Sequence, residues 1–171
     1  TLFQDAVKAM PANEAPAWIT EKLRELRVQQ SSTVATSRSI VASLRRGIDV
    51  VTQDGPKMVP LWINFDYDRD TISGKGMEQL SELGKALRDK ELSGKRFLLV
   101  GHTDTKGSAE YNLNLSKRRA DSVQKSLIAR CPELAGRLKA EGRGAREPLA
   151  KGAGEDNDRM NRRVEVAIVP E

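Results

Sequence analysis

The chain has 171 residues, a formal net charge of +5 and 31% charged residues, but only 4% aromatic residues. This length suits one domain with its own core plus an appendage. The basic residues are scattered and aromatic platforms for base stacking are sparse, so we expect no nucleic-acid binding. The single cysteine, Cys131, rules out an internal disulfide bond. No apolar run is long enough to cross a bilayer, so we expect any membrane tether to lie in a segment absent from this chain.

Residues 1–57 differ in character from the rest and predict a helical N-terminal extension. Their apolar residues form short stripes at helical spacing, the last of them around residues 40–48, and Pro11 and Pro16 interrupt the first stripes. Helices this short cannot hold a core alone. We therefore expect a spacer or collar packed on a main domain of residues 58–171, and deleting residues 1–50 should leave the function of that domain nearly intact.

Turn and strand signals mark the entry to the main domain. Asp54-Gly55-Pro56 predicts a turn between residues 48–52 and 58–61, which would form a hairpin. Pro60 restricts this feature to an edge of the sheet, because proline cannot donate a ladder hydrogen bond. The run Trp62-Ile63-Asn64-Phe65 predicts the first strand of the main domain.

The remaining segments alternate between strand and helix patterns. Ser73 is the expected cap of a helix whose wet face includes Gln79, and whose buried stripe is Met77, Leu80, Leu83, Gly84 and Leu87. Strands are predicted at residues 97–100, 138–142 and 164–169, and residues 152–157 predict a flexible loop. This order predicts an α/β two-layer sandwich, βαβαββ, with the helices packed on one mixed sheet. The strand order within the sheet does not follow from the pattern.

The stretch from Phe97 to Val123 organises the chain. A short apolar strand leads into the polar loop 102–107, and Ser108 is well placed to cap a long helix. At 100° per residue, one helix face collects Asn112, Leu115, Ser116, Arg119, Ala120, Val123 and Leu127. Arg119 thus points with the apolar residues, whereas Arg118 points to solvent. A buried guanidinium needs an anionic partner, and we expect either Asp104 or a bound anion to supply it.

This stretch also resembles a known family. Its fixed positions are Thr103-Asp104-x-x-Gly107 and Tyr111-Asn112-x-x-Leu115-Ser116-x-x-Arg119-Ala120-x-x-Val123. They are similar to the signature of the OmpA-like peptidoglycan-binding domain, which OmpA-type porin tails, peptidoglycan-associated lipoproteins and flagellar stator proteins share. The similarity continues through Gly142-Arg143-Gly144, Pro148 and Asn161-Arg162-Arg163-Val164-Glu165, and it covers roughly residues 62–169. Many fixed positions in order are more specific than one short motif.

The resemblance implies a function and a site. It implies non-catalytic binding of peptidoglycan through the meso-diaminopimelate of the stem peptide, in the periplasm of a Gram-negative bacterium, anchoring an envelope or outer-membrane protein without a cofactor. The diaminopimelate head carries one ammonium and one carboxylate, which a fixed carboxylate and a planar guanidinium can hold. In the family the positions of Asp104 and Arg119 hold the ligand, and those of Asn112 and Arg163 line the pocket. Backbone N–H groups near Thr103 would favour the anionic group, and Asp66 is a weaker candidate.

The sequence offers fewer suitable residues for hydrolytic catalysis or for metal binding. A peptidoglycan hydrolase or amidase would depend on His102, the only histidine, with Asp104 two residues away and no Gly-x-Ser-x-Gly elbow. One histidine and one cysteine give no metal-ligand cluster along the sequence. The simplest structural alternative is that Asp104 and Arg119 pair with each other and join the loop to the helix.

Overall fold

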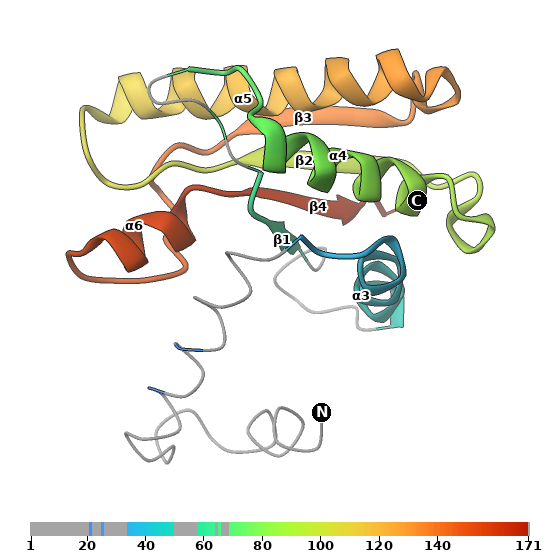
Figure 1. Ribbon diagram of the computed structural model, residues 1–171, viewed down its shortest axis with the longest axis horizontal. Coiled ribbons are helices and arrows are strands. Elements are labelled where there is room, and N and C mark those ends of the chain that lie inside the picture. The colour runs from blue at the N-terminus through green and yellow to red at the C-terminus, as the bar shows by residue number, and fades with distance from the viewer. Residues whose placement is uncertain are drawn as a thin grey trace.

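The computed structural model describes residues 34–49, 58–63, 65 and 69–170, together with Glu21 and Glu25 (Figure 1). Its helices are α3 (Ser37–Asp49), α4 (Gly74–Leu87), α5 (Ala109–Arg130) and α6 (Glu155–Asn161). Its strands are β1 (Val59–Leu61), β2 (Phe97–Gly101), β3 (Leu138–Gly142) and β4 (Val164–Ile168). The predicted turn at 54–56 and the candidate Asp66 lie outside the described residues. No described helix combines the length and apolar character that crossing a membrane requires.

The four strands form one mixed sheet in the order β1-β4-β2-β3. β2 and β3 are parallel, whereas β4 runs antiparallel to both β1 and β2. The predicted α/β fold with helices on one mixed sheet is therefore confirmed. The last strand of the sequence lies in the interior of the sheet, between β1 and β2, which brings the start of β4 beside the end of β2.

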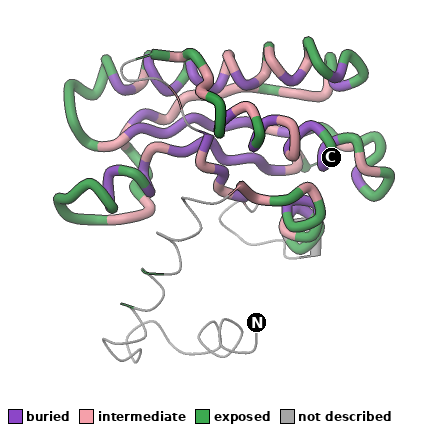
Figure 2. The backbone as a smooth tube through the Cα atoms, viewed as in Figure 1, coloured by how far each residue is buried: buried purple, intermediate pink, exposed green. Residues whose placement is uncertain are grey.

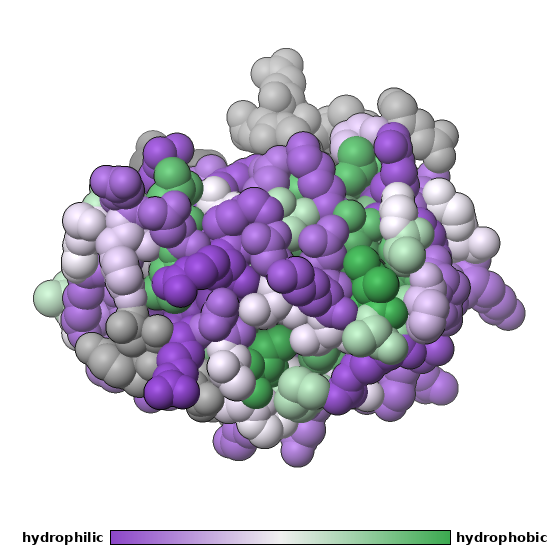
Figure 3. All heavy atoms as spheres, turned by 90° about the horizontal axis from the view of Figure 1, so that it is seen from above, coloured by the Kyte–Doolittle hydropathy of each residue, from purple (hydrophilic) through white to green (hydrophobic). Residues whose placement is uncertain are grey.

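The helices α3, α4 and α5 lie side by side over one face of the sheet (Figure 1). Phe97 and Leu99 of β2 are in register with Ile168 and Val166 of β4 and belong to the hydrophobic core on that face. Figure 2 shows buried residues along the strands and on the inner sides of the helices. The outer surface viewed from above is mostly hydrophilic, with small apolar patches (Figure 3).

Three boundary predictions were wrong. Residues 48 and 49, expected in the first strand of a hairpin, belong to the helix α3. The first strand is Val59–Leu61 rather than residues 62–65, because Val59 and Leu61 pair with Val166 and Val164 and fill the core, and Pro60 lies between them. The edge position expected for Pro60 is confirmed, since β1 is the edge strand. The loop predicted at 152–157 ends earlier: α6 begins at Glu155, directly after Gly154, whose φ of 126° favours glycine.

Hydrogen bonds connect the start of helix α3 to α4. The Gln79 amide donates to Ala35 O (3.0 Å) and accepts from Ala35 N–H (2.7 Å), and the Glu82 carboxylate accepts from Ser37 N–H (2.7 Å). Gln79 was expected on the wet face but is buried, because the segment leading into α3 covers it. Ile40, Val41 and Leu44 of this helix join the main core, so α3 packs on the main domain. The boundary between residues 57 and 58 stays a prediction.

Helix α5 packs very closely on β2 and β3. A Cβ at Gly101 would lie 2.2 Å from Ser116 O, and one at Gly142 would lie 2.4 Å from Lys117 N, so only glycine permits this approach. The predicted phase of the helix is confirmed, since its buried residues are Asn112, Leu115, Ser116, Arg119, Ala120, Val123 and Leu127. The predicted cap is confirmed as well, because the Ser108 hydroxyl accepts from Tyr111 N–H.

Candidate ligand-binding site

The loop after β2 carries the first group of the site, the Asp104 carboxylate. The loop is fixed by main-chain bonds from His102 N–H to Arg163 O and from Thr103 N–H to Gly144 O, both 2.9 Å. Asp104 Oδ1 accepts from Lys106 N–H at 3.1 Å, a local turn that holds the carboxylate in place. Because the Thr103 N–H is already engaged, it is not among the backbone donors left for an anion. Thr103 instead contributes a buried side chain whose hydroxyl donates to Asp104 O.

Helix α5 supplies two further groups, Asn112 and Arg119. The Asn112 amide donates to Lys106 O (3.0 Å) and is 3.4 Å from Asp104 O, so it fastens the loop to the helix. Arg119 Nε donates to Arg69 O at 3.1 Å, and the guanidinium lies 5.0 Å from the centre of the Phe65 ring. Both side chains are buried. The cation–π contact and the close packing of α5 fix the direction of the Arg119 fork.

A residue that the sequence reasoning overlooked completes the group. Arg162, which follows α6, makes an ion pair with Asp104 Oδ2 at 3.0 Å and a second one with Glu155. Burial lowers the pKa of Arg162, but hydrogen bonds to Glu155 and Asp104 outweigh it and raise the pKa above its usual value. The simple alternative, in which Asp104 pairs with Arg119, is therefore replaced by a pair with Arg162. The only sequence signal for Arg162 is the Asn161-Arg162-Arg163 motif, in which the family resemblance implies a pocket role for Arg163 instead.

These groups surround one open cavity of about 460 Å³, here called the mixed-charge cavity. Its polar lining is Thr103, Asp104, Lys106, Asn112, Arg119, Glu155 and Arg162. Four of the five predicted site residues thus line this cavity, and Arg163 does not. A cavity with carboxylates and guanidinium groups on its walls suits a ligand that carries both an ammonium and a carboxylate.

Arg163 lines a neighbouring cavity of about 230 Å³, here called the arginine cavity, together with Trp62, Ile63, Phe65, His102, Arg119, Arg159 and Arg162. The two cavities share Phe65, Arg119 and Arg162. The Arg163 fork is buried and donates to Glu165 Oε1 (2.8 Å) and Glu147 O (2.9 Å). Burial lowers the pKa of Arg163, and the facing charge of Glu165 opposes that shift without cancelling it.

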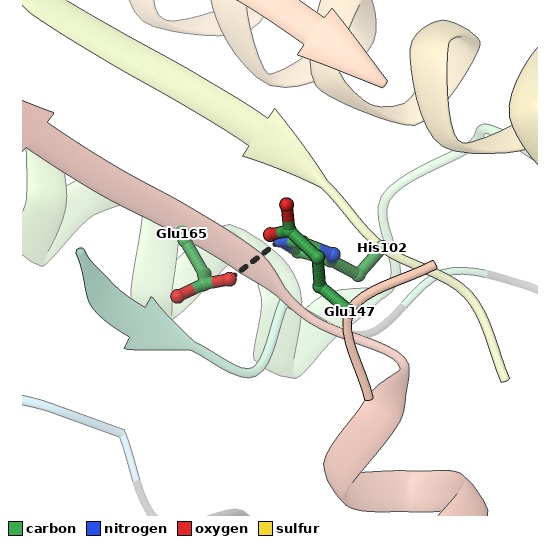
Figure 4. Close-up of side chains that lie close together, drawn as sticks. All are labelled: His102, Glu147 and Glu165. Atoms are coloured by element: carbon green, nitrogen blue, oxygen red, sulfur yellow. Dashed lines mark ion pairs between the residues drawn. The ribbon is translucent and has the colours of Figure 1, made fainter. Parts of the chain in front are cut away.

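Beside the arginine cavity, His102 meets two carboxylates (Figure 4). Nε2 of His102 lies 2.5 Å from Glu165 Oε1, and ligand atoms of His102, Glu147 and Glu165 all lie within 4.8 Å of one another. These are metal-ligand types that only the fold brings together. Glu165 Oε1 already meets Arg163 and His102, however, so its charge is balanced without a cation. Burial would raise the pKa of Glu165, but His102 and Arg163 outweigh it and lower the pKa.

The same contacts bear on the hydrolase alternative. The His102 side chain is only 1% exposed, and one ring nitrogen is held against Glu165. Among the described residues, no serine, threonine or cysteine lines the arginine cavity with it. A general base needs a nucleophile or a water path within reach, and the described lining of this cavity offers no side-chain nucleophile.

Comparisons with known proteins agree with this architecture. Residues 64–162, more than half of the chain, match the OmpA family. The chain is 31% identical to outer membrane protein A of Bordetella avium over 72% of its length and 66% of the relative's. It is 37% identical to the peptidoglycan-associated lipoprotein of Pseudomonas aeruginosa over 60% of its length and 58% of the relative's. The chain thus spans 58–66% of the length of these relatives.

A solved structure gives the same result for the fold. The cell wall anchor of the T6SS from Pseudomonas aeruginosa superposes with a TM-score of 0.55 at 30% identity, covering 67% of this chain and 80% of that one. The matched family span contains the loop after β2, all of α5 and Arg162, which are the elements that build the mixed-charge cavity. The chain belongs to the OmpA family.

Proposed function

We propose that this protein is a non-catalytic module that binds peptidoglycan and anchors an outer-membrane or envelope protein to the cell wall from the periplasm. One observation carries the proposal: in a chain of the OmpA family, Asp104 and Arg119 line the same cavity. Two matched proteins are a peptidoglycan-associated lipoprotein and a cell wall anchor, which supports the same class of partner. No cofactor is needed for such binding.

The ligand chemistry follows from the walls of the mixed-charge cavity. The head of meso-diaminopimelate presents an ammonium to Asp104 and a carboxylate to the fork of Arg119. Asn112 holds the loop at the right distance from α5 through Lys106 O and Asp104 O. Arg162 pairs with Asp104 and holds that carboxylate in one direction before the ligand arrives.

Sedimentation with purified cell-wall sacculi tests the function. The whole chain should pellet with diaminopimelate-containing sacculi, and free meso-diaminopimelate should release it. Sacculi in which lysine replaces diaminopimelate are the matched control, because lysine lacks the second carboxylate, and they should retain much less protein. Protein that stays in the supernatant with both kinds of sacculi would overturn the proposal. Release of soluble muropeptides during incubation would instead indicate a hydrolase.

A further inference from the structure

The end of the sheet opposite the ligand site is built from two matching turns. One turn joins α4 to β2 and the other joins α5 to β3. Each contains a buried leucine, a glycine and a basic residue, in the order Leu92-Ser93-Gly94-Lys95 and Leu134-Ala135-Gly136-Arg137. Gly94 and Gly136 have φ values of 75° and 81°, and a Cβ at either position would meet nothing within 4 Å. The described part of the chain therefore leaves both turns uncovered at their tips.

Hydrogen bonds hold the two turns side by side. The Arg137 guanidinium donates to Lys95 O (2.9 Å) and to Leu92 O (3.0 Å), and Phe97 N–H donates to Arg137 O (2.7 Å). Because β2 and β3 are parallel and in register, both turns lie at the amino ends of their strands. The loop of Asp104 follows the carboxyl end of β2, so the turns lie at the end of the sheet away from α6 and the ligand site (Figure 1).

The two turns and their flanks carry an excess of positive charge. Residues 88–96 and 130–137 hold six lysines or arginines and three carboxylates, in a chain whose formal net charge is +5. Lys90, Arg96 and Arg130 are exposed, and their side chains make no ion pair or hydrogen bond with the described residues. The two turns and these three cations are here called the basal surface.

The carboxylates of the same segments leave this charge largely uncompensated. Glu133 pairs with Arg88 (3.4 Å), and Glu91 pairs with Arg45 of α3 (3.0 Å). The Asp89 carboxylate accepts from Glu91 N–H at 2.9 Å and caps the 3₁₀ turn that follows it. The basal surface thus keeps a net positive charge that faces solvent, where an anionic partner can reach it.

We propose that the basal surface binds the phosphate headgroups of anionic phospholipids at a membrane surface. This inference rests on the proposed function, because a module that holds the cell wall at one end of its sheet turns the other end toward the membrane. Lysine and arginine donate strong hydrogen bonds to phosphate oxygens, and a bilayer surface presents many such groups to cations that lie on one side of a protein.

A membrane surface suits these features better than a protein partner does. The core of a protein interface is apolar and rich in aromatic residues. The one exposed large hydrophobic side chain in the described part of the chain, Tyr111, lines the mixed-charge cavity instead. Between the cations, the exposed residues of the turns include Ser93, Pro132 and Ala135, which give no apolar anchor. Lipids diffuse within the bilayer and can gather around dispersed charges, so they need no such anchor.

Sedimentation of the whole chain with lipid vesicles tests the inference. The chain should pellet at low salt with vesicles of phosphatidylcholine and phosphatidylglycerol, but not with phosphatidylcholine alone, and high salt should release it. The triple variant Lys90→Gln, Arg96→Gln, Arg130→Gln should bind the anionic vesicles roughly a hundredfold more weakly, because each cation near an anionic surface contributes about fivefold.

A matched control separates this surface from the net charge of the chain. Arg118→Gln, Arg146→Gln and Lys151→Gln together remove the same charge from exposed positions elsewhere and should weaken vesicle binding by less than about threefold. An equal loss in both triple variants, or a parent chain that stays in the supernatant with anionic vesicles at low salt, would overturn the inference.

Sacculi distinguish that failure from failure of the proposed function. The basal triple variant should pellet with diaminopimelate-containing sacculi like the parent chain. Loss of sacculus binding in place of vesicle binding would overturn the inference and assign the basal surface to the cell wall. A parent chain that binds anionic vesicles through these cations but binds no sacculi would overturn the proposed function and leave the lipid surface standing.

Discussion

The Asp104 carboxylate and the Arg162 guanidinium meet at 3.0 Å although 58 residues separate them in the sequence. Asp104 belongs to the loop after β2 and Arg162 to the segment between α6 and β4. Because β4 lies between β1 and β2 in the sheet, the start of β4 returns beside the end of β2. The pair thus closes one wall of the mixed-charge cavity and presents Asp104 in a fixed direction.

A double-mutant cycle measures this pair. Asp104→Asn, Arg162→Gln and the double variant should give a coupling free energy of unfolding of about 0.5–1 kcal/mol, because Arg162 is about one-third exposed and solvent screens the pair. Urea unfolding at low and high salt checks it, and the coupling should fall as salt rises. A coupling near zero at low salt would show that the pair does not hold the loop.

Arg119 and Arg118 are adjacent in sequence but opposite in environment, since Arg119 is buried and Arg118 exposed. Arg119→Ala should weaken binding of a diaminopimelate peptide by about 2–5 kcal/mol, or roughly thirtyfold to several thousandfold, because the ligand carboxylate loses its partner. Arg118→Ala should change affinity by less than about twofold. Calorimetry gives the affinities, and a thermal melt of each variant shows whether it is folded. A damaging Arg118→Ala with a silent Arg119→Ala would contradict the site.

Glu165 should make the protein acid-sensitive. Its pKa is lowered in the folded state from a usual value of 4.5, so the stabilisation is complete above that value and is lost as pH falls through the lower, folded-state value. Glu165→Gln should cost about 3–5 kcal/mol at neutral pH, because Arg163 keeps a buried charge without its partner. It should also flatten the loss of stability below pH 4.5. Urea unfolding at several pH values checks both, and the exposed Glu110→Gln should match the parent chain.

The contribution of α3 to the core revises the expected effect of truncation. Removing residues 1–50 would strip Ile40, Val41 and Leu44 from the core and expose Gln79, so we expect a less stable protein. The substitution Leu44→Ala isolates the effect and should cost about 2–5 kcal/mol of unfolding free energy. Ala42→Ser, on the exposed side of the same helix, is the control. If Leu44→Ala has the same urea midpoint of unfolding as the parent chain, α3 does not contribute to the stability of the core.

The sequence by itself determined the local structure of the site. Helical periodicity placed Arg119 and Asn112 on the buried face of α5, and the Ser108 cap set where that helix begins. Such features depend on interactions within a few residues, which repeat with the period of the helix. The mixed α/β fold followed from the same patterns, together with the resemblance to the family.

Only the tertiary structure decided which distant groups meet. Asp104 pairs with Arg162, which lies 58 positions away in the sequence. Gln79 is buried beneath the segment before α3, where its partner Ala35 lies 44 positions away. Neither follows from a local pattern, because each depends on strand order and on how the helices cover the sheet. The arginine cavity has the same origin: β4 runs antiparallel between β1 and β2, and this brings Arg163 and Glu165 against His102.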